Sequence, residues 1–341
     1  MTEKVKQYAP KIWEQIQKSK KILMHLHPSP DGDSVGGVLA MTHLFKRIGK
    51  KVTIISGDSV LPKSLSFLPG FGEILPKNYF QIKPEDFDLF LILDTSSLNQ
   101  ISKIDKIVFP EKLTTIVIDH HSTNEGFGTI DLVETSYSAT CRILYDLIKE
   151  WRQPITAEMA VCLLMGIYTD SGGFKYLLKT SRETFLAAAD LITIYPDFPK
   201  AIFTYENMGQ PEQISYLGLA LSSIETFFSG KVAMAVVPYK ELAKRGIKKE
   251  HTDKMEVSNY LKSVVGWEIG ISFTEVEPNV VNLSLRTRDA EKFNVAKIAL
   301  ATGFGGGLKA AAGATLKMPF QEAKKFLLET IKKVYPGLGE P

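Results

Sequence analysis

The sequence predicts two α/β domains, and three observations support this fold class. The chain has 341 residues, more than a single hydrophobic core usually organises. Its first half alternates short apolar runs with longer amphipathic stretches, the pattern of a parallel sheet covered on both faces. The segment 194–214 then breaks this alternation with prolines and mixed polarity. We therefore expect one domain at 1–193, a linker at 194–214 and a second domain at 215–341.

The N-terminal domain is expected to contain a parallel sheet. Short apolar runs predict strands at 21–26, 51–56, 88–94 and 114–119. Apolar residues with helical spacing predict helices at 34–49, 138–151 and 156–170. Because parallel strands need long crossover connections, the alternation of strand and helix favours parallel pairing.

The C-terminal domain is expected to be a smaller α/β unit with a mixed sheet. A helix is predicted at 212–227, followed by strands at 231–238, 268–276 and 280–288. A helix at 294–303, a glycine run at 303–307 and a last helix at 320–335 complete this domain.

The composition excludes several classes of protein. A hydrophobic content of 44% and a charged content of 23% are typical of a soluble globular chain. The net charge of +3 gives no strong field for a long nucleic acid. No apolar run approaches the roughly 18 residues that span a bilayer, and the N-terminus has no apolar signal core. Cys141 and Cys162 are expected to be buried free thiols in a reducing cytoplasm.

Carboxylates and imidazoles gather where predicted elements end. They are His27, Asp31 and Asp33 after the first strand, Asp94 after the third, Asp119, His120 and His121 after the fourth, and Asp170 at the end of a helix. Ligands of open parallel sheets bind outside the carboxyl ends of the strands, so these groups are expected to converge. A single member could instead be a turn residue or a helix N-cap, and for Asp33 this alternative carries equal weight.

The set as a whole predicts bound cations. Close carboxylates in a partly buried site repel one another by several kcal/mol, and a divalent cation keeps them ionised. Carboxylates mixed with imidazole and no thiolate suit manganese or a similar octahedral ion better than structural zinc. The number of groups exceeds the needs of one ion and fits two, an arrangement that activates water for in-line displacement at phosphorus.

Four motifs in the first domain resemble those of the DHH phosphoesterases. They read HPSPDGD, LILD, VIDHHSTN and GIYTDSGGF, in this order. In the second domain, SLRTR followed by GFGGGLKAAAG resembles the DHH-associated C-terminal domain and its glycine-rich motif. Size and domain pairing are most similar to the nanoRNase and pAp phosphatase group. This resemblance implies an active site in the interdomain cleft.

The resemblance also implies roles for individual residues. One Mn²⁺ would be bound by His27 and Asp31, and the other by Asp33, His120 and Asp170, with Asp94 bridging both. Mg²⁺ or Co²⁺ could substitute. The catalytic set would be Asp94, His121 facing the phosphate and Asp119 orienting an imidazole or a loop. The substrate-binding set would be Arg286, Gly305, Gly306, Gly307 and Asn124, which completes the DHHxxN pattern.

Some of these residues could instead have a purely structural role, and at two positions the sequence departs from the family pattern. A glycine run is often only a tight connection, and Arg286 could be a solvated strand residue. Leu308 stands where the family has a histidine after the glycines, and Gln100 stands where it often has an arginine. Both changes concern substrate recognition and leave the predicted metal site whole. His25 falls outside the motif spacing, so we expect it to support the site or the core.

The sequence therefore predicts a cytoplasmic, manganese-dependent phosphoesterase without a membrane partner, and a homodimer is possible. Its substrates would be short oligonucleotides, nucleotide 3′,5′-bisphosphates or both, hydrolysed by two-metal in-line attack of water. A different small phosphate ester or a cyclic dinucleotide is an alternative substrate. A nucleotide-binding regulatory protein with weakened catalysis is a further alternative, motivated by Leu308.

Overall fold

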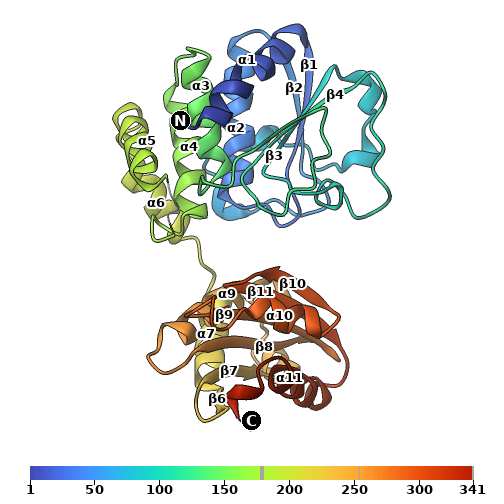
Figure 1. The fold of residues 1–341 in the computed structure, drawn as a ribbon, viewed down its shortest axis with the longest axis vertical. Coiled ribbons are helices and arrows are strands. Elements are labelled where there is room, and N and C mark those ends of the chain that lie inside the picture. The colour runs from blue at the N-terminus through green and yellow to red at the C-terminus, as the bar shows by residue number, and fades with distance from the viewer. Residues whose placement is uncertain (177–179, 253, 340–341) are drawn as a thin grey trace. The chain divides into compact units, whose positions relative to one another are not determined.

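The chain folds into two units in this computed structural model, Met1–Met208 and Gly209–Pro341 (Figure 1). The structure describes residues 1–176, 180–252 and 254–339. The segment 194–214, expected to be a linker, contains helix α6 (Phe198–Glu206) and the first residues of α7 (Pro211–Ser222). Helix α6 packs into the first unit through Phe198 and Ala201, so much of that segment is structured.

Unit 1 is built on the expected parallel sheet. Its strands are β1 (Lys21–His25), β2 (Lys51–Ile55), β3 (Leu89–Leu93), β4 (Thr114–Asp119) and β5 (Ile130–Val133), in the order β2-β1-β3-β4-β5. All neighbouring strands pair in parallel. The chain reverses its direction of winding between β1 and β3, and this is the point at which open α/β sheets bind ligands. Strand β5 was not predicted, because its four residues are too short for a clear apolar pattern.

Among the described residues, α-helices cover one face of this sheet. They are α1 (Glu3–Lys18), α2 (Gly32–Arg47), α3 (Thr140–Glu150) and α4 (Ala157–Asp170), with α5 (Ser181–Ile194) packed outside them. The opposite face packs against Tyr79, Ile101 and Ile107 from irregular segments with short 3₁₀ turns. The expectation that both faces are covered is confirmed, but α-helices form only one of the two layers.

Two glycines allow helices α2, α3 and α4 to approach closely. A Cβ on Gly36 would lie 2.3 Å from the carbonyl oxygen of Cys162, and one on Gly166 would lie 2.3 Å from Sγ of Cys141. Real Cβ atoms do not come so close to backbone or buried atoms. The close packing brings Asp33, at the start of α2, next to α4, which ends at Asp170.

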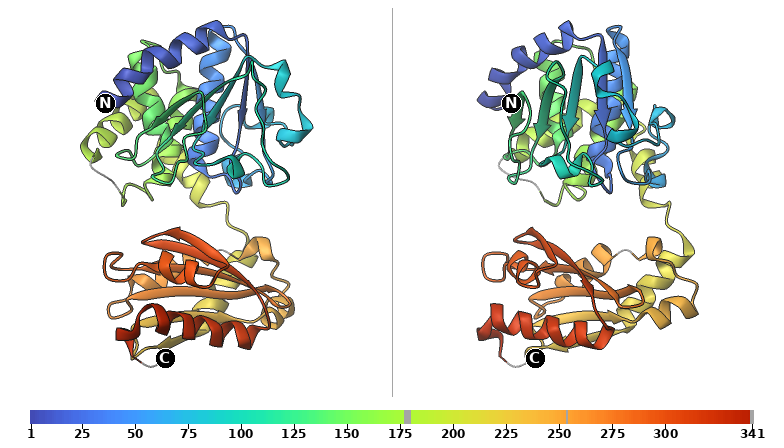
Figure 2. Two further views of the ribbon diagram at one scale, coloured as in Figure 1. Left: turned by 45° about the vertical axis from the view of Figure 1, so that its right-hand side comes forward. Right: turned by 90° about the vertical axis from the view of Figure 1, so that its right-hand side faces the viewer.

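Unit 2 contains the expected mixed sheet. Its strands are β6 (Ile224–Phe227), β7 (Val232–Val237), β8 (Ile269–Glu277), β9 (Val280–Thr287), β10 (Gly305–Leu308) and β11 (Ala311–Lys317), in the order β10-β11-β9-β8-β7-β6. Only the β7–β8 pair is parallel among these strands. Helices α10 (Val295–Ala301) and α11 (Phe320–Val334) pack on one face (Figure 2). Helices α7, α8 (Tyr239–Lys244) and α9 (Lys254–Ser263) pack on the other.

One local prediction for unit 2 was wrong, and the structure of one segment was left open by the sequence. The helix predicted at 212–227 ends at Ser222, and the residues Ile224–Phe227 form the edge strand β6. The glycine run, for which a tight connection was the plain alternative to substrate binding, contributes Gly305, Gly306 and Gly307 to edge strand β10, which pairs with β11. Both segments form an edge strand, because pairing with a neighbouring strand outweighs a weak local pattern.

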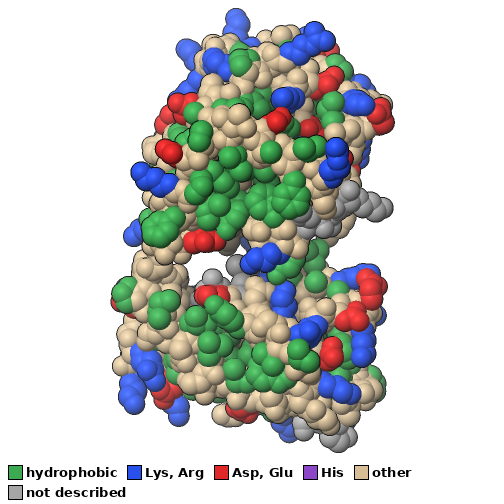
Figure 3. Space-filling model, turned by 90° about the vertical axis from the view of Figure 1, so that its left-hand side faces the viewer, with side chains coloured by type: hydrophobic (Ala, Val, Ile, Leu, Met, Phe, Trp, Pro, Cys, Tyr) green, Lys and Arg blue, Asp and Glu red, His purple; other side chains and the backbone are tan. Residues whose placement is uncertain are grey.

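Large apolar side chains are exposed on one face of unit 1. Phe185 and Leu186 of α5 and Phe203 of α6 are each more than half exposed, and Figure 3 shows hydrophobic side chains gathered over this region. Within the described residues, none of the helices combines the length and the apolar character that crossing a bilayer requires.

Candidate metal centre

The carboxyl ends of β1, β3 and β4 meet at one edge of the first sheet. His27 follows β1, Asp94 follows β3, and Asp119 is the last residue of β4. This edge includes the β1–β3 switch point, where the strand order predicts a ligand.

The predicted acids and imidazoles form overlapping groups at this edge. Three groups have ligand atoms within 4.8 Å of one another among the described residues: His27, Asp31 and Asp94; Asp33, His120 and Asp170; and Asp94, His120 and His121. Asp94 and His120 each belong to two of these groups. The first two groups match the two ligand sets expected from the sequence. The third group adds His121, which the sequence reasoning placed at the phosphate and not at a metal, as a further side chain within ligand reach.

Asp94 is the centre of the cluster. Its Oδ2 lies 3.2 Å from Nε2 of His27, and its Oδ1 lies 3.6 Å from Nε2 of His120 and 3.5 Å from Nδ1 of His121. Its backbone has a φ of +53°, which is uncommon for a residue other than glycine. The side chain is almost fully buried, at 2% exposure, so its charge needs compensation from these neighbours or from a cation.

The two aspartates of the first motif have different partners. Asp31 is the N-cap of α2, and its Oδ1 accepts hydrogen bonds from the backbone N–H groups of Asp33 and Ser34. Asp33 does not cap this helix. Its carboxylate accepts hydrogen bonds from the backbone N–H groups of Thr140, at 2.6 Å, and Cys141, at 2.8 Å. The N-cap alternative for Asp33 was therefore wrong, and the cap is Asp31.

His120 provides the test of whether the centre fits a cation. Its Nδ1 lies 3.3 Å from the carbonyl oxygen of Tyr137, which places the proton on Nδ1. Its Nε2 is buried and lacks a hydrogen-bond partner within the part of the chain that the structure describes. This atom lies 3.1 Å from Oδ2 of Asp170. An unprotonated imidazole nitrogen among carboxylate oxygens is a donor set that a divalent cation completes.

His121 is oriented by Asp119. Nδ1 of His121 lies 2.8 Å from Oδ1 of Asp119, and the backbone N–H groups of His120 and His121 donate to the same oxygen. Asn124 donates from Nδ2 to the other oxygen of Asp119 and to the carbonyl oxygen of Thr95. Its Oδ1 accepts from the N–H of Gly126. Both the nitrogen and the oxygen of the Asn124 amide therefore have partners within the protein. These hydrogen bonds do not support the prediction that Asn124 contacts substrate.

The electrostatics of the centre show a deficit of positive charge. Burial lowers the pKa of His27, but hydrogen bonds to Asp31 and Asp94 outweigh it and raise this pKa to about 11. Burial and the charges of Asp94 and Asp31 raise the pKa of Asp33 well above its usual value. Burial, Asp33 and Asp94 raise the pKa of Asp170 in the same way. The carboxyl groups of Asp33 and Asp170 therefore tend to keep their protons, and added cations would allow both groups to ionise.

Two neighbouring residues support the loops around the centre. His25 is fully buried below the site and stacks edge-on against Phe90, so its expected supporting role in the core is confirmed. Oε1 of Gln100 accepts hydrogen bonds from the backbone N–H and the hydroxyl of Ser96. Gln100 thus holds the loop that follows Asp94, a role that its sequence position did not indicate.

The predicted substrate-binding residues of unit 2 lie near one edge of its sheet. Arg286 is half-buried on β9, and its Nη1 donates to Oγ of Ser284 and to the carbonyl oxygen of Leu285. Leu308 pairs with Ala311, which pairs with Arg286, so these side chains project from the same face of the sheet. Leu308 is 56% exposed. Gly305 and Gly307 approach β11 so closely that a Cβ would clash with its backbone.

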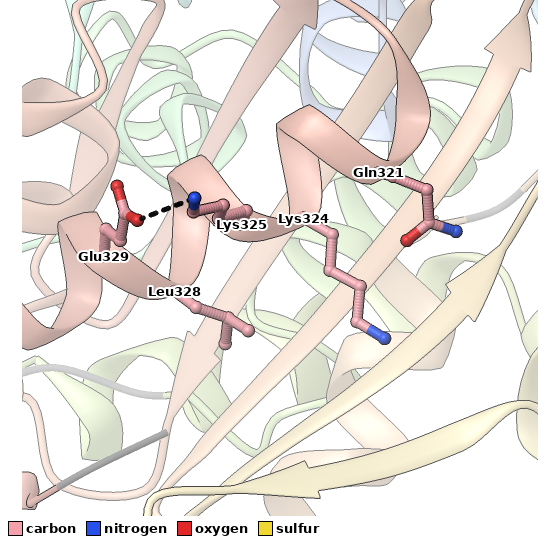
Figure 4. Close-up of a pocket in the computed structure, with 5 residues that line it drawn as sticks. All are labelled: Gln321, Lys324, Lys325, Leu328 and Glu329. Atoms are coloured by element: carbon pink, nitrogen blue, oxygen red, sulfur yellow. Dashed lines mark ion pairs between the residues drawn. The ribbon is translucent and has the colours of Figure 1, made fainter.

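A surface hollow of unit 2 lies along helix α11 (Figure 4). Lys324 beside it forms an ion pair with Glu225, and Lys325 lies 4.0 Å from Glu329. The side chains that line the hollow are those of Gln321, Lys324, Lys325, Leu328 and Glu329. The hollow includes none of the candidate residues, and we assign it no part in the site.

The fold and the centre define a class of protein, and the comparisons agree with it. A parallel sheet with carboxylates and imidazoles at its switch point is an arrangement that suits a divalent-cation site. Residues 21–167 match the model of the DHH family, N-terminal domain. The family resemblance seen in the motifs is confirmed for these residues.

Individual relatives are similar over nearly the whole chain. The bifunctional oligoribonuclease and PAP phosphatase NrnA of Thermus thermophilus is 27% identical over 339 residues, covering 97% of both chains. The protein of the same name from Mycoplasma genitalium is 26% identical, covering 88% of this chain and 90% of that one. The crystal structure of an exopolyphosphatase-related protein from Bacteroides fragilis matches with a TM-score of 0.86 and 25% identity, covering 97% of both chains.

The sequence reasoning missed the groups that hold the ligands in place. The backbone N–H groups of Thr140 and Cys141 bind Asp33, and the carbonyl oxygen of Tyr137 binds His120. The available signal was the run TSYSAT directly before a helical pattern, since hydroxyl residues mark helix N-termini.

Proposed function

We propose that this protein is a divalent-metal-dependent phosphoesterase that hydrolyses short oligonucleotides, nucleotide 3′,5′-bisphosphates or both. The observation that carries the proposal is that two ligand groups lie at one edge of the sheet: His27, Asp31 and Asp94 in one, and Asp33, His120 and Asp170 in the other. Support also comes from relatives named as oligoribonucleases and PAP phosphatases, which align with this chain over most of their length.

Two cations fit the donor atoms of the centre. His27 and Asp31 would hold one, Asp33, His120 and Asp170 would hold the other, and Asp94 would contact both. We propose Mn²⁺, with Mg²⁺ or Co²⁺ as substitutes, because the donors are carboxylate oxygens and imidazole nitrogens without thiolate. When bound, the cations would supply Lewis-acid charge to the phosphoryl oxygens and would acidify the attacking water.

His121 is the proposed proton donor of the reaction. Burial lowers its pKa, but the hydrogen bond to Asp119 and the charge of Asp94 raise it to about 9. In the metal-free protein the ring is then an imidazolium at neutral pH, whose Nδ1 donates to Asp119 and whose Nε2 carries a second proton. Nε2 would donate to a phosphoryl oxygen or to the leaving oxygen. Asp119 would hold the ring in this orientation.

The substrate would be recognised by unit 2. Arg286 presents a guanidinium that can bind two oxygens of a terminal phosphate, and Gly305, Gly306 and Gly307 leave the edge strand without side chains. Asn124 stays a proposed substrate contact of unit 1. The net charge of +3 favours a short substrate, because long strands are held by many phosphate contacts.

A substrate panel tests the proposal. The metal-stripped full-length protein would be mixed with Mn²⁺ and a dinucleotide RNA, a longer RNA, a 3′,5′-bisphosphate nucleotide or a cyclic dinucleotide. We expect mononucleotide release from the dinucleotide or phosphate release from the bisphosphate, and no reaction without metal. Turnover of the cyclic dinucleotide alone would favour the alternative substrate. Tight binding without turnover across the panel would favour a regulatory protein.

Leu308 is tested in the same panel. Its side chain shares a sheet face with Arg286 but can neither donate a hydrogen bond nor carry charge. The L308H variant restores the family residue, so we expect a changed order of substrate preference with unchanged metal dependence. An unchanged order would remove Leu308 from substrate recognition.

A further inference from the structure

A short segment directly behind the metal centre holds several of its ligands. Residues 137–141, here called the positioning segment, lead into the first turn of α3. All five are buried, with exposures between 0% and 5%. Their burial means that the segment acts on the centre from the protein interior and does not line an opening for substrate.

The positioning segment contacts three different candidate ligands. The carbonyl oxygen of Tyr137 accepts a hydrogen bond from Nδ1 of His120. The backbone N–H groups of Thr140 and Cys141 donate to the two carboxylate oxygens of Asp33. The hydroxyl of Thr140 lies 3.4 Å from Oδ1 of Asp94, to which it can donate.

These contacts prepare the ligands for a cation. A proton held on Nδ1 leaves the lone pair of His120 on Nε2, the buried atom without a partner in the described part of the chain. Two amide donors at a helix N-terminus favour the ionised form of Asp33 and fix its plane. The Thr140 hydroxyl adds a donor to the carboxylate that belongs to two ligand groups.

The segment is itself rigidly held. The hydroxyl of Tyr137 donates to Oδ2 of Asp146 at 2.5 Å, and the Arg142 guanidinium lies 4.9 Å from the Tyr137 ring. Arg142 and Asp146 form a buried ion pair at 2.6 Å. The carbonyl and amide groups that meet the ligands are therefore fixed before any cation binds.

We propose that Thr140 is a positioning residue of the metal centre, acting on Asp94 through its hydroxyl and on Asp33 through its backbone N–H. This inference rests on the proposed metal-dependent function. Thr140 touches no substrate atom, so its effect should appear first in cation affinity. Partners of metal ligands typically contribute 10–100-fold in affinity or activity, which sets the expected size on the order of tenfold.

Three variants of the full-length protein separate this role from general packing. T140V keeps the shape and the backbone N–H but removes the hydroxyl, and T140S keeps the hydroxyl. T42V is the matched control, because Thr42 is a buried helical threonine of the same unit whose hydroxyl donates to the carbonyl oxygen of Val38. Mn²⁺ would be titrated into each metal-free protein, with free Mn²⁺ followed by its paramagnetic resonance signal. Thermal unfolding of the metal-free proteins would report packing damage.

We expect T140V to bind Mn²⁺ about tenfold more weakly than the wild type, with T140S and T42V close to the wild type. Wild-type affinity in T140V, or an equal loss in T42V, would overturn the inference. A loss in T140V that T140S does not rescue would also overturn it, because the hydroxyl would then not be the cause. A wild-type protein that binds no Mn²⁺ would overturn the metal centre itself and this inference with it.

Discussion

At the scale of single residues, Asp94 combines two features that rarely occur together. It has a positive φ directly after a buried strand, and its almost fully buried carboxylate faces three imidazoles. A left-handed conformation at a residue other than glycine costs on the order of 1–3 kcal/mol and persists where the surrounding structure enforces it. The strain places the carboxylate between His27 and His120, where two cations could share it.

The pair His121 and Asp119 allows a test by pH. The pKa of His121 is raised, so its donor form is present below that pKa and is lost as the pH rises through it. D119N removes the charge that contributes to the increase. We expect the alkaline limb of the kcat/KM profile to move to lower pH in D119N, because the imidazolium loses its proton earlier.

The control for this prediction is D105N, which changes an exposed carboxylate outside the centre. The profile of D105N should follow that of the wild type. An alkaline limb that stays in place in D119N would mean that His121 is not the group that titrates.

The candidate metal ligands were predictable from the sequence, whereas the groups that hydrogen-bond to them were not. Asp94 and His120 stand at the ends of apolar runs, and strand ends mark ligand sites. The partner of Asp33 is Thr140, 107 residues away along the chain. No local sequence pattern predicts a hydrogen bond between residues so far apart in the chain, because this bond forms only when α2 and α3 pack together.

At the scale of elements, the packing of α2 against α4 sets the spacing of the centre. A Cβ at Gly36 would meet the backbone oxygen of Cys162 at 2.3 Å, and a backbone atom cannot rotate away. We expect G36A to lower the free energy of unfolding by about 1–3 kcal/mol, as overpacked cores do. Chemical denaturation of the metal-free protein would measure this loss.

G218A is the matched control for this substitution. Gly218 also lies inside a helix, α7, but an added Cβ there would have no atom within 4 Å. Alanine should keep or raise stability at this position by up to about 1 kcal/mol. Equal effects of G36A and G218A would show that the close approach of α2 and α4 does not limit stability.

The strands of unit 1 with strong apolar patterns were predicted well. The four strands expected in unit 1 appear as β1 to β4, with ends that differ by one residue or none. The long helices α1 and α5 were not predicted. Other misses are short elements such as β5, β6 and α8. Their apolar pattern is too brief to distinguish a strand from a helix or a loop, so the surrounding sheet decides their structure.

At the scale of the whole molecule, catalysis and recognition are expected to be divided between the units. All candidate metal ligands belong to unit 1, and Arg286 belongs to unit 2. We expect R286A to raise KM by roughly 10–100-fold, since a hydrogen bond to a charged group contributes about 1.5–3 kcal/mol. Its affinity for Mn²⁺ should equal that of the wild type. Steady-state kinetics and Mn²⁺ titration would measure the two quantities.

R245A removes another arginine of unit 2, an exposed one at the end of α8, and should leave KM unchanged. A loss of Mn²⁺ affinity in R286A would contradict the division of roles. An unchanged KM would favour the plain alternative that Arg286 is a strand residue without a substrate.

The most direct test of the metal-dependent function compares the wild type with D94A in the hydrolysis of a dinucleotide RNA. Asp94 belongs to the first proposed cation site, and its Oδ1 lies 3.6 Å from Nε2 of His120 in the second, so its loss should weaken both sites. We predict that the wild type releases mononucleotides only when Mn²⁺ is present, and that D94A releases none at the same Mn²⁺ concentration. Full turnover by D94A, or by the metal-stripped wild type, would contradict the account.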